Sequence, residues 1–99
     1  MIVRSGTRTA ELYGTTEAIE DYYCNYGVNP EYQRRLEERG LRVSGVGDEG
    51  EIRIVELSDH PFFLGTLFLP QARSTRAHPH PLLRGYADAV ARARAASPR

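Results

Sequence analysis

The sequence predicts a small α+β domain in which a mixed or antiparallel sheet is combined with two helices. An amphipathic stretch from Pro30 to Arg39 is followed by two apolar runs, 41–46 and 51–57, that flank a Gly-Asp-Glu-Gly turn. This order indicates a helix and then a β-hairpin. A third apolar run, Leu64 to Phe68, lies between two prolines and indicates a further strand. We expect residues 1–99 to form a single domain.

The first predicted helix has both of its ends marked in the sequence. Asn29 is a suitable N-cap, and Pro30 suits the first helical position because its fixed φ is already helical. Gly40 follows the last helical residue, where glycine readily adopts the left-handed conformation that ends a helix. Tyr32 and Leu36 are one turn apart and form the apolar side of this helix.

The run from Leu64 to Phe68 is apolar almost throughout, which is typical of a strand buried on both faces inside a sheet. Pro61 prevents a helix from continuing through this segment, and Pro70 cannot donate a hydrogen bond to a neighbouring strand. In mixed α/β folds, the residues just after such a strand usually carry the chemistry. Here they are Leu69, Pro70 and Gln71, none of which can act as an acid, a base or a nucleophile.

The two ends of the chain complete the predicted elements. After a polar loop from Gln71 to His80, Pro81 opens a final helix that should cover the sheet. Its apolar residues recur at helical spacing: Leu82, Leu83, Tyr86, Val90 and Ala93. Near the start, weak alternation over residues 3–13 predicts one or two short edge strands, and the aromatic residues from Tyr22 to Tyr26 predict another strand.

Composition argues against several classes of function. Acidic and basic residues balance at 13 each, so nothing indicates electrostatic binding of nucleic acid or of a membrane. No apolar run reaches membrane-spanning length and the first residues lack a signal-peptide core, so we expect a soluble, cytoplasmic protein. The single cysteine, Cys24, cannot form an internal disulfide and leaves too few thiols for a structural zinc site. We expect no cofactor.

The order of these segments resembles the last part of the class I glutamine amidotransferase domain, most closely the one that ends CTP synthases. Residues 29–32 read Asn-Pro-Glu-Tyr as in that family, and residues 41–45 read Leu-Arg-Val-Ser-Gly where the family has Leu-Val-Ile-Ser-Gly. Residues 56–63, Glu-Leu-Ser-Asp-His-Pro-Phe-Phe, are nearly identical to their counterpart. The chain also resembles a branch of proteins related to this C-terminal region. The resemblance implies a fragment of a flavodoxin-like α/β fold, with the nucleophile-bearing portion absent because it precedes these residues.

The resemblance also locates what the chain lacks. The family hydrolyses glutamine with a cysteine nucleophile, a histidine that deprotonates it and a glutamate that orients the histidine. The histidine and the glutamate belong to a Phe-His-Pro-Glu-Phe motif, and residues 68–72 of this chain read Phe-Leu-Pro-Gln-Ala at the same positions. Leu69, which replaces the histidine, has no proton to exchange. Gln71, which replaces the glutamate, carries no charge to stabilise an imidazolium.

The segment that helps the family to hold glutamine has changed as well. Its arginine–histidine run here reads Tyr-Tyr-Cys-Asn, so Asn25 and Tyr26 are at most a remnant of the substrate site, and glutamine binding is in doubt. Cys24 is predicted to be a buried packing thiol, and a reactive thiol is the alternative. We expect His78 and His80 to make loop and helix-cap hydrogen bonds rather than bind a metal, because no further ligands stand at a recognisable spacing.

These observations predict a non-catalytic amidotransferase-like module, a pseudoenzyme that acts as an interaction or regulatory partner. One alternative is glutaminase or CTP synthase activity when another chain supplies the cysteine and a substitute base. A third class is a binding module that keeps a remnant of an ammonia or nucleotide site. The surface that the front portion covers in the family would be exposed here, so we expect a homo-oligomer or a partner protein that supplies the missing half of the domain.

Overall fold

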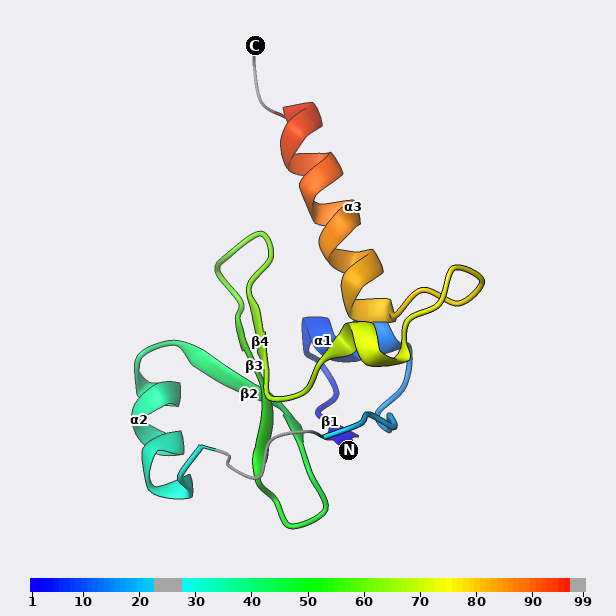
Figure 1. Cartoon of the computed structure of the whole chain (residues 1–99). Helices are drawn as coiled ribbons and strands as arrows, with labels where there is room; N and C mark the ends of the chain where they lie inside the picture. Colours follow the sequence, from blue (N-terminus) through cyan, green and yellow to red (C-terminus); the bar gives the residue numbers. More distant parts are fainter. Residues whose placement is uncertain (23–27, 97–99) are drawn as a thin grey trace.

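The centre of the fold is an antiparallel sheet built from consecutive segments of the chain (Figure 1). The computed structural model describes residues 1–22 and 28–96, and within them the sheet has four strands in the order β1-β2-β3-β4. Their bounds are Ile2–Val3 for β1, Leu41–Val46 for β2, Ile52–Leu57 for β3 and Leu64–Thr66 for β4. The predicted α+β class with an antiparallel sheet is therefore confirmed.

Helices lie on both sides of this sheet. Their bounds in the described residues are Arg8–Tyr13 for α1, Gln33–Glu38 for α2 and Pro81–Ala96 for α3, with 3₁₀ turns at Pro30–Tyr32 (η1) and Pro70–Arg73 (η2). α2 packs beside β2, whereas α1 and α3 pack against each other on the other side (Figure 1). Within the described ranges, no helix has the length and apolar character needed to cross a membrane.

Two predicted elements are found where the sequence places them. The helix predicted over residues 30–39 begins as η1 and continues as α2, and Gly40 follows it with a positive φ of 95°. The predicted hairpin is formed by β2 and β3, whose register shifts at an irregularity around Gly45. Glycine is required at this position because a Cβ atom there would lie 2.8 Å from Cγ1 of Ile54.

The prediction of a strand buried on both faces over residues 64–68 is wrong. β4 ends at Thr66, forms one edge of the described sheet and is only partly buried. Two apolar residues of this stretch do reach the core, because Phe68 clusters with Ile54 and Leu64 packs against that cluster. Apolar residues on an edge strand and in the turn after it resemble a buried strand in sequence, since hydrophobicity alone does not show which neighbours cover them.

The strands predicted at the start of the chain are only partly found. Of residues 3–13, Val3 alone belongs to a strand, and α1 takes the place of the rest of that prediction. Tyr22, the first residue of the other predicted strand, is not in a strand. Residues 23–26 of that prediction lie outside the described residues.

α1 forms because its first turn is capped from two directions. Thr7 is the N-cap, and its Oγ1 accepts a hydrogen bond of 3.1 Å from the backbone N–H of Ala10. The buried carboxylate of Glu56, on β3, accepts hydrogen bonds from the backbone N–H groups of Arg8 (3.1 Å) and Thr9 (3.2 Å). A negative charge at the start of a helix also interacts favourably with the helix dipole. Because β3 is far away in the sequence, a local pattern could not reveal this contact.

α3 buries only one residue of its predicted apolar side, Leu82, and packs otherwise through a side of small residues. Its buried residues are Leu82, Gly85 and Ala89, whereas three residues of the predicted apolar side are exposed, namely Leu83, Tyr86 and Val90. The small side of α3 is buried because α1 approaches it closely. A Cβ atom on Gly85 would lie 2.5 Å from Cδ2 of Leu12.

Replacing Gly85 by leucine should lower the free energy of unfolding by about 1–3 kcal/mol, the usual cost of an extra side chain in a filled space. Leu12 of α1 already occupies the position that the new side chain would enter. Urea denaturation followed by circular dichroism measures the change. Ala87→Leu, on the exposed side of α3, is the matched control and should leave the midpoint nearly unchanged. An equal loss in both variants would contradict this account of the packing of α1 on α3.

Candidate functional site

The candidate site is the segment that follows β4, where the resemblance places the catalytic histidine and glutamate of the family. Leu69 immediately precedes η2, and Gln71 belongs to it. Both side chains lie at the surface, and Leu69 is 48% exposed. The backbone of η2 is ordered by its own turn, in which the N–H of Ala72 donates to the carbonyl of Leu69 over 3.0 Å. The segment therefore presents an apolar and an uncharged side chain to solvent, and neither can carry out acid–base chemistry.

A buried trio of titratable side chains lies beside this segment. Tyr13 ends α1, Glu20 lies in the segment after α1, and His80 immediately precedes α3. Nε2 of His80 and the hydroxyl of Tyr13 both lie 2.5 Å from Oε2 of Glu20. The side chains of His80 and Glu20 are only 4% and 2% exposed. The carboxylate of Glu20 thus joins three separate parts of the chain.

The hydrogen bonds of His80 fix its tautomer. Its Nδ1 accepts a hydrogen bond of 3.1 Å from the backbone N–H of Leu82, at the start of α3. Nδ1 is therefore unprotonated, and the ring proton on Nε2 is donated to Glu20. The expected helix-cap role of His80 is what the structure shows. With both ring nitrogens engaged and the ring buried, His80 is not placed to take a proton from a substrate or a nucleophile.

The same contacts change the acidity of Tyr13. Burial, followed by the hydrogen bond to the carboxylate of Glu20, raises the pKa of Tyr13 well above its ordinary value. Both effects disfavour the phenolate, because it would lose solvation and would stand next to a negative charge. The hydroxyl is therefore a fixed donor to Glu20.

Further contacts tie the segment around residues 20–22 to the candidate site. Asp21 forms an ion pair with Arg73 of η2 at 3.1 Å. The ring of Tyr22 packs against Phe68, with ring centroids 6.3 Å apart, and the guanidinium of Arg53 lies 3.9 Å above the Tyr22 ring. The structure thus brings residues 20–22 and 68–73 side by side.

Three of the remaining predicted site residues, Cys24, Asn25 and Tyr26, are outside the described residues. His78 lies in the exposed loop before α3. In residues 1–22 and 28–96, no cluster of three or more His, Cys, Asp or Glu side chains is suited to a metal. The trio was missed by the sequence reasoning because its members are far apart in the chain and follow no spacing rule.

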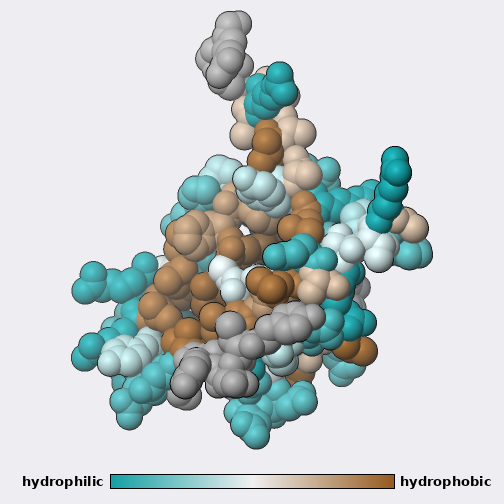
Figure 2. Space-filling view, viewed as in Figure 1, coloured by the Kyte–Doolittle hydropathy of each residue, from teal (hydrophilic) through white to brown (hydrophobic). Residues whose placement is uncertain are grey.

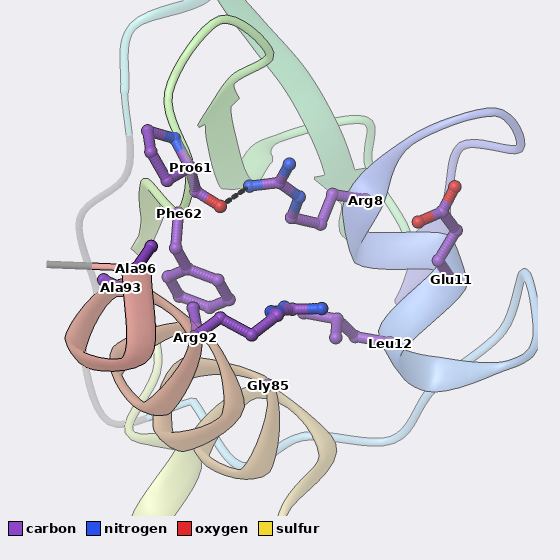
Figure 3. Close-up of a pocket in the computed structure, with 10 residues that line it drawn as sticks. Arg8, Glu11, Leu12, Pro61, Phe62, Gly85, Arg92, Ala93 and Ala96 are labelled. Atoms are coloured by element: carbon purple, nitrogen blue, oxygen red, sulfur yellow. Dashed lines mark hydrogen bonds between the residues drawn. The ribbon is translucent and has the colours of Figure 1, made fainter.

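A cleft of about 540 Å³ opens between α1, α3 and the turn before β4 (Figure 3). Its walls include Phe62 and Leu12, and Arg8 and Arg92 extend into it from α1 and α3. Arg8 is already engaged, since its guanidinium donates hydrogen bonds to the backbone carbonyls of His60 and Pro61. Among the residues that the structure describes, no histidine, cysteine or serine lines the cleft. The hydrogen bonds of Arg8 hold the turn before β4 against α1.

Comparison with known proteins identifies relatives of the chain. No protein-family model matches it. It is 46% identical to the CTP synthase of Aeropyrum pernix over 91 residues, which are 90% of this chain and 17% of that protein. It is 38% identical to the CTP synthase of Mesoplasma florum over 89 residues, or 89% of this chain and 17% of that protein. The chain thus spans about one sixth of the length of these CTP synthases.

The solved structures include a close match in fold. The glutaminase domain of a Trypanosoma brucei CTP synthase, determined with bound acivicin, superposes with a TM-score of 0.85 at 29% sequence identity. The match covers 92% of this chain and 37% of that chain. The resemblance to the class I glutamine amidotransferase domain of CTP synthases is therefore confirmed, and the fold is that of one part of such a domain.

Replacing Tyr13 by phenylalanine should make stability less sensitive to alkaline pH. The folded state holds the Tyr13 proton more tightly than the unfolded state, whose tyrosine has a pKa of 10.0. This contribution to stability is complete below about pH 10 and is lost as the pH rises further toward the folded pKa. Urea unfolding at a series of pH values from about 8 to about 11 measures the slope.

Tyr86→Phe is the control for the pH series, because it removes an exposed hydroxyl and should leave the slope unchanged. Tyr13→Phe should also cost about 1–2 kcal/mol at neutral pH through the lost hydrogen bond. If the slopes of the unmodified chain and Tyr13→Phe coincide, the Tyr13 proton is not held by Glu20 as described.

Proposed function

We propose that this chain, a homologue of the glutaminase region of CTP synthases, is a non-catalytic glutamine amidotransferase-like module that works by binding another polypeptide. The observation that carries the proposal is the exposed pair Leu69 and Gln71 in an otherwise retained scaffold. A general base must hold and release a proton near the reacting atoms, and a leucine side chain has none. An amide in place of the glutamate would not supply the charge that stabilises an imidazolium.

Two of the three described histidines support this reading, because each of the two is used in another way. His80 has both ring nitrogens occupied by Glu20 and by the N–H of Leu82. His60 accepts a hydrogen bond of 3.1 Å on Nδ1 from the backbone N–H of Phe62 and so stabilises the turn before β4. For His60 or His80 to act as a substitute base, one of these hydrogen bonds would have to be given up, whereas His78 lies exposed in the loop before α3.

A second candidate function is glutamine hydrolysis by complementation, in which another polypeptide supplies the cysteine nucleophile and a base. The contacts between the two halves of the candidate site favour it. Asp21 pairs with Arg73, and Glu20 is held against His80. A scaffold kept in this order would present Gln71 and its neighbours to a partner's active site in a defined geometry.

Ammonia release from glutamine distinguishes these two functions. The unmodified chain should show no hydrolysis above background, either alone or together with the portion of the Aeropyrum pernix glutaminase domain that these residues do not match. The double variant Leu69→His with Gln71→Glu, tested with the same portion, is the matched control. It restores the histidine and glutamate and should exceed the unmodified chain by about 10²–10⁴-fold, the usual contribution of a positioned general base.

Two other results would count against the proposal. Hydrolysis by the unmodified chain with the added portion would replace it by complementation, because the base would then come from elsewhere. Hydrolysis by the unmodified chain alone would show that residues 1–99 hold a complete site.

A further inference from the structure

We propose that the cleft between α1, α3 and the turn before β4 binds a small aromatic acid, a molecule with one oxyanion group on a single aromatic ring. The oxyanion, a carboxylate or a phosphate, lies between the guanidinium groups of Arg8 and Arg92, and the ring packs beside Phe62. We call this region the two-arginine cleft. The inference goes beyond the proposed function and does not depend on it, because neither a partner polypeptide nor residues 69 and 71 enter the argument.

The two-arginine cleft has the size of a small-molecule site. Its volume of about 540 Å³ lies within the range of roughly 300–1,000 Å³ that is usual for ligand pockets. On the side of α3 it is lined by small residues, among them Gly85, Ala89 and Ala93. Small side chains leave the space beside a helix open, because they fill little of it. A molecule of the size of one ring therefore has room in the cleft.

Two arginines give the cleft a positive character. Figure 3 shows their side chains extending into the same space, Arg8 from α1 and Arg92 from α3. Glu11 also lines the cleft, so two cationic groups and one acidic group face it. Within residues 1–22 and 28–96, neither arginine forms an ion pair with a carboxylate. Guanidinium groups bind carboxylates and phosphates through paired N–H donors, so an oxyanion is the group that suits this position.

Arg8 is held in place and still has donors for a ligand. Its hydrogen bonds both run from Nη1, to the backbone carbonyls of His60 and Pro61. A guanidinium has five N–H donors, and those on Nε and Nη2 of Arg8 have no partner among the described residues. The positive charge is also uncompensated by these contacts, because both acceptors are neutral. A side chain that is already ordered loses little conformational entropy on binding, which favours affinity.

Phe62 supplies the aromatic contact. Its ring packs on the ring of Tyr86, with centroids 5.7 Å apart, so its position is fixed from one side. Phe62 also lines the same cleft as both arginines, together with Leu12. An aromatic ring that enters the cleft can pack on Phe62 in the offset or edge-to-face arrangement that such pairs prefer. The cleft thus offers an aromatic wall and a cationic pair to one ligand, which selects an aromatic acid over an inorganic anion.

Two other hollows of the described structure are less suited to an anion. Hydrophobic residues gather over the strands and around the base of α3 (Figure 2). A groove of about 180 Å³ between α3, β4 and η2 has no charged side chain among the described residues that line it. A further hollow is lined by Arg84 but also by Glu11 and Asp88, so its acidic groups outnumber its cationic one. The excess of positive charge beside an aromatic wall therefore distinguishes the two-arginine cleft.

Titration calorimetry of the whole chain with four probes tests the site. Phenyl phosphate and benzoate combine a ring with an oxyanion, inorganic phosphate has the charge alone, and benzyl alcohol has the ring alone. We expect saturable one-to-one binding of phenyl phosphate or benzoate, with a Kd of about 1 mM or lower. Inorganic phosphate and benzyl alcohol should each bind about tenfold more weakly or worse, because each lacks one of the two contacts. The aromatic acid that binds more tightly identifies the oxyanion.

Two substitutions test the charge of the cleft. Arg92→Gln should weaken binding of the aromatic acid by about tenfold or more, since charge-assisted hydrogen bonds are lost. Arg94→Gln is its matched control, because it removes the same charge from the same helix but does not line the cleft. Ala93→Glu adds a negative charge to the cleft and should also weaken binding, whereas Ala91→Glu, outside the cleft, should not. All four positions are exposed, so the unfolding midpoint should stay nearly unchanged.

Amide NMR spectra of the labelled chain locate the bound probe. Shift changes centred on residues 8–12, 61–62 and 85–93 support the proposal, and changes centred elsewhere overturn it. It is also overturned if neither aromatic acid binds saturably, or if inorganic phosphate binds as tightly as the aromatic acids. Equal effects of Arg92→Gln and Arg94→Gln would overturn it as well, because the affinity would then depend on the charge of α3 as a whole.

Discussion

The fold depends on a buried carboxylate that joins a strand to a helix. Glu56 on β3 accepts hydrogen bonds from the first N–H groups of α1, and the hydroxyl of Thr9 donates to it over 2.8 Å. A buried charge is costly unless it is fully hydrogen-bonded, so the carboxylate holds α1 in one position relative to the sheet. α1 in turn sets the place of α3, because Leu12 packs against Gly85. These contacts together decide which side of α3 faces outward, namely the side that carries Leu83, Tyr86 and Val90.

A second polar network organises the region of the candidate site. Glu20 receives hydrogen bonds from Tyr13 and His80, so it joins the end of α1 to the start of α3. Asp21, the next residue, pairs with Arg73 of η2. These contacts hold residues 20 and 21 against η2 and the start of α3. Buried hydrogen bonds maintain this region, whereas Leu69 and Gln71 lie at its surface.

The contacts that hold the fold together explain why so much of the sequence is similar to that of an enzyme. Residues in the hairpin, in the turn before β4 and around His80 are needed for packing and hydrogen bonding, whatever the activity. Surface residues such as Leu69 and Gln71 are freer to change, because exposed side chains contribute little to stability. An apolar residue at such a position alters what the surface can bind more than it alters the fold.

The sequence alone determined the elements whose signals are local. The helix after Asn29 has its cap and its stop within a dozen residues, and the β2–β3 hairpin has its turn between two apolar runs. The sequence also shows leucine at position 69 and glutamine at position 71, so the expectation that these two side chains form no acid–base pair needs no structure. Each of these inferences uses residues that are close together in the chain.

Only the tertiary structure decided the features that depend on distant partners. α1 requires Glu56, which stands 47 and 48 residues away from the helix residues that it caps. The apolar stretch that follows Pro61 could not show that β4 would be an edge strand, since hydrophobicity is the same whether a partner covers it or not. The apolar side of α3 faces outward because Gly85, not Tyr86, faces α1. Long-range contacts thus selected among the conformations that the local sequence permits, and they left Leu83, Tyr86 and Val90 exposed.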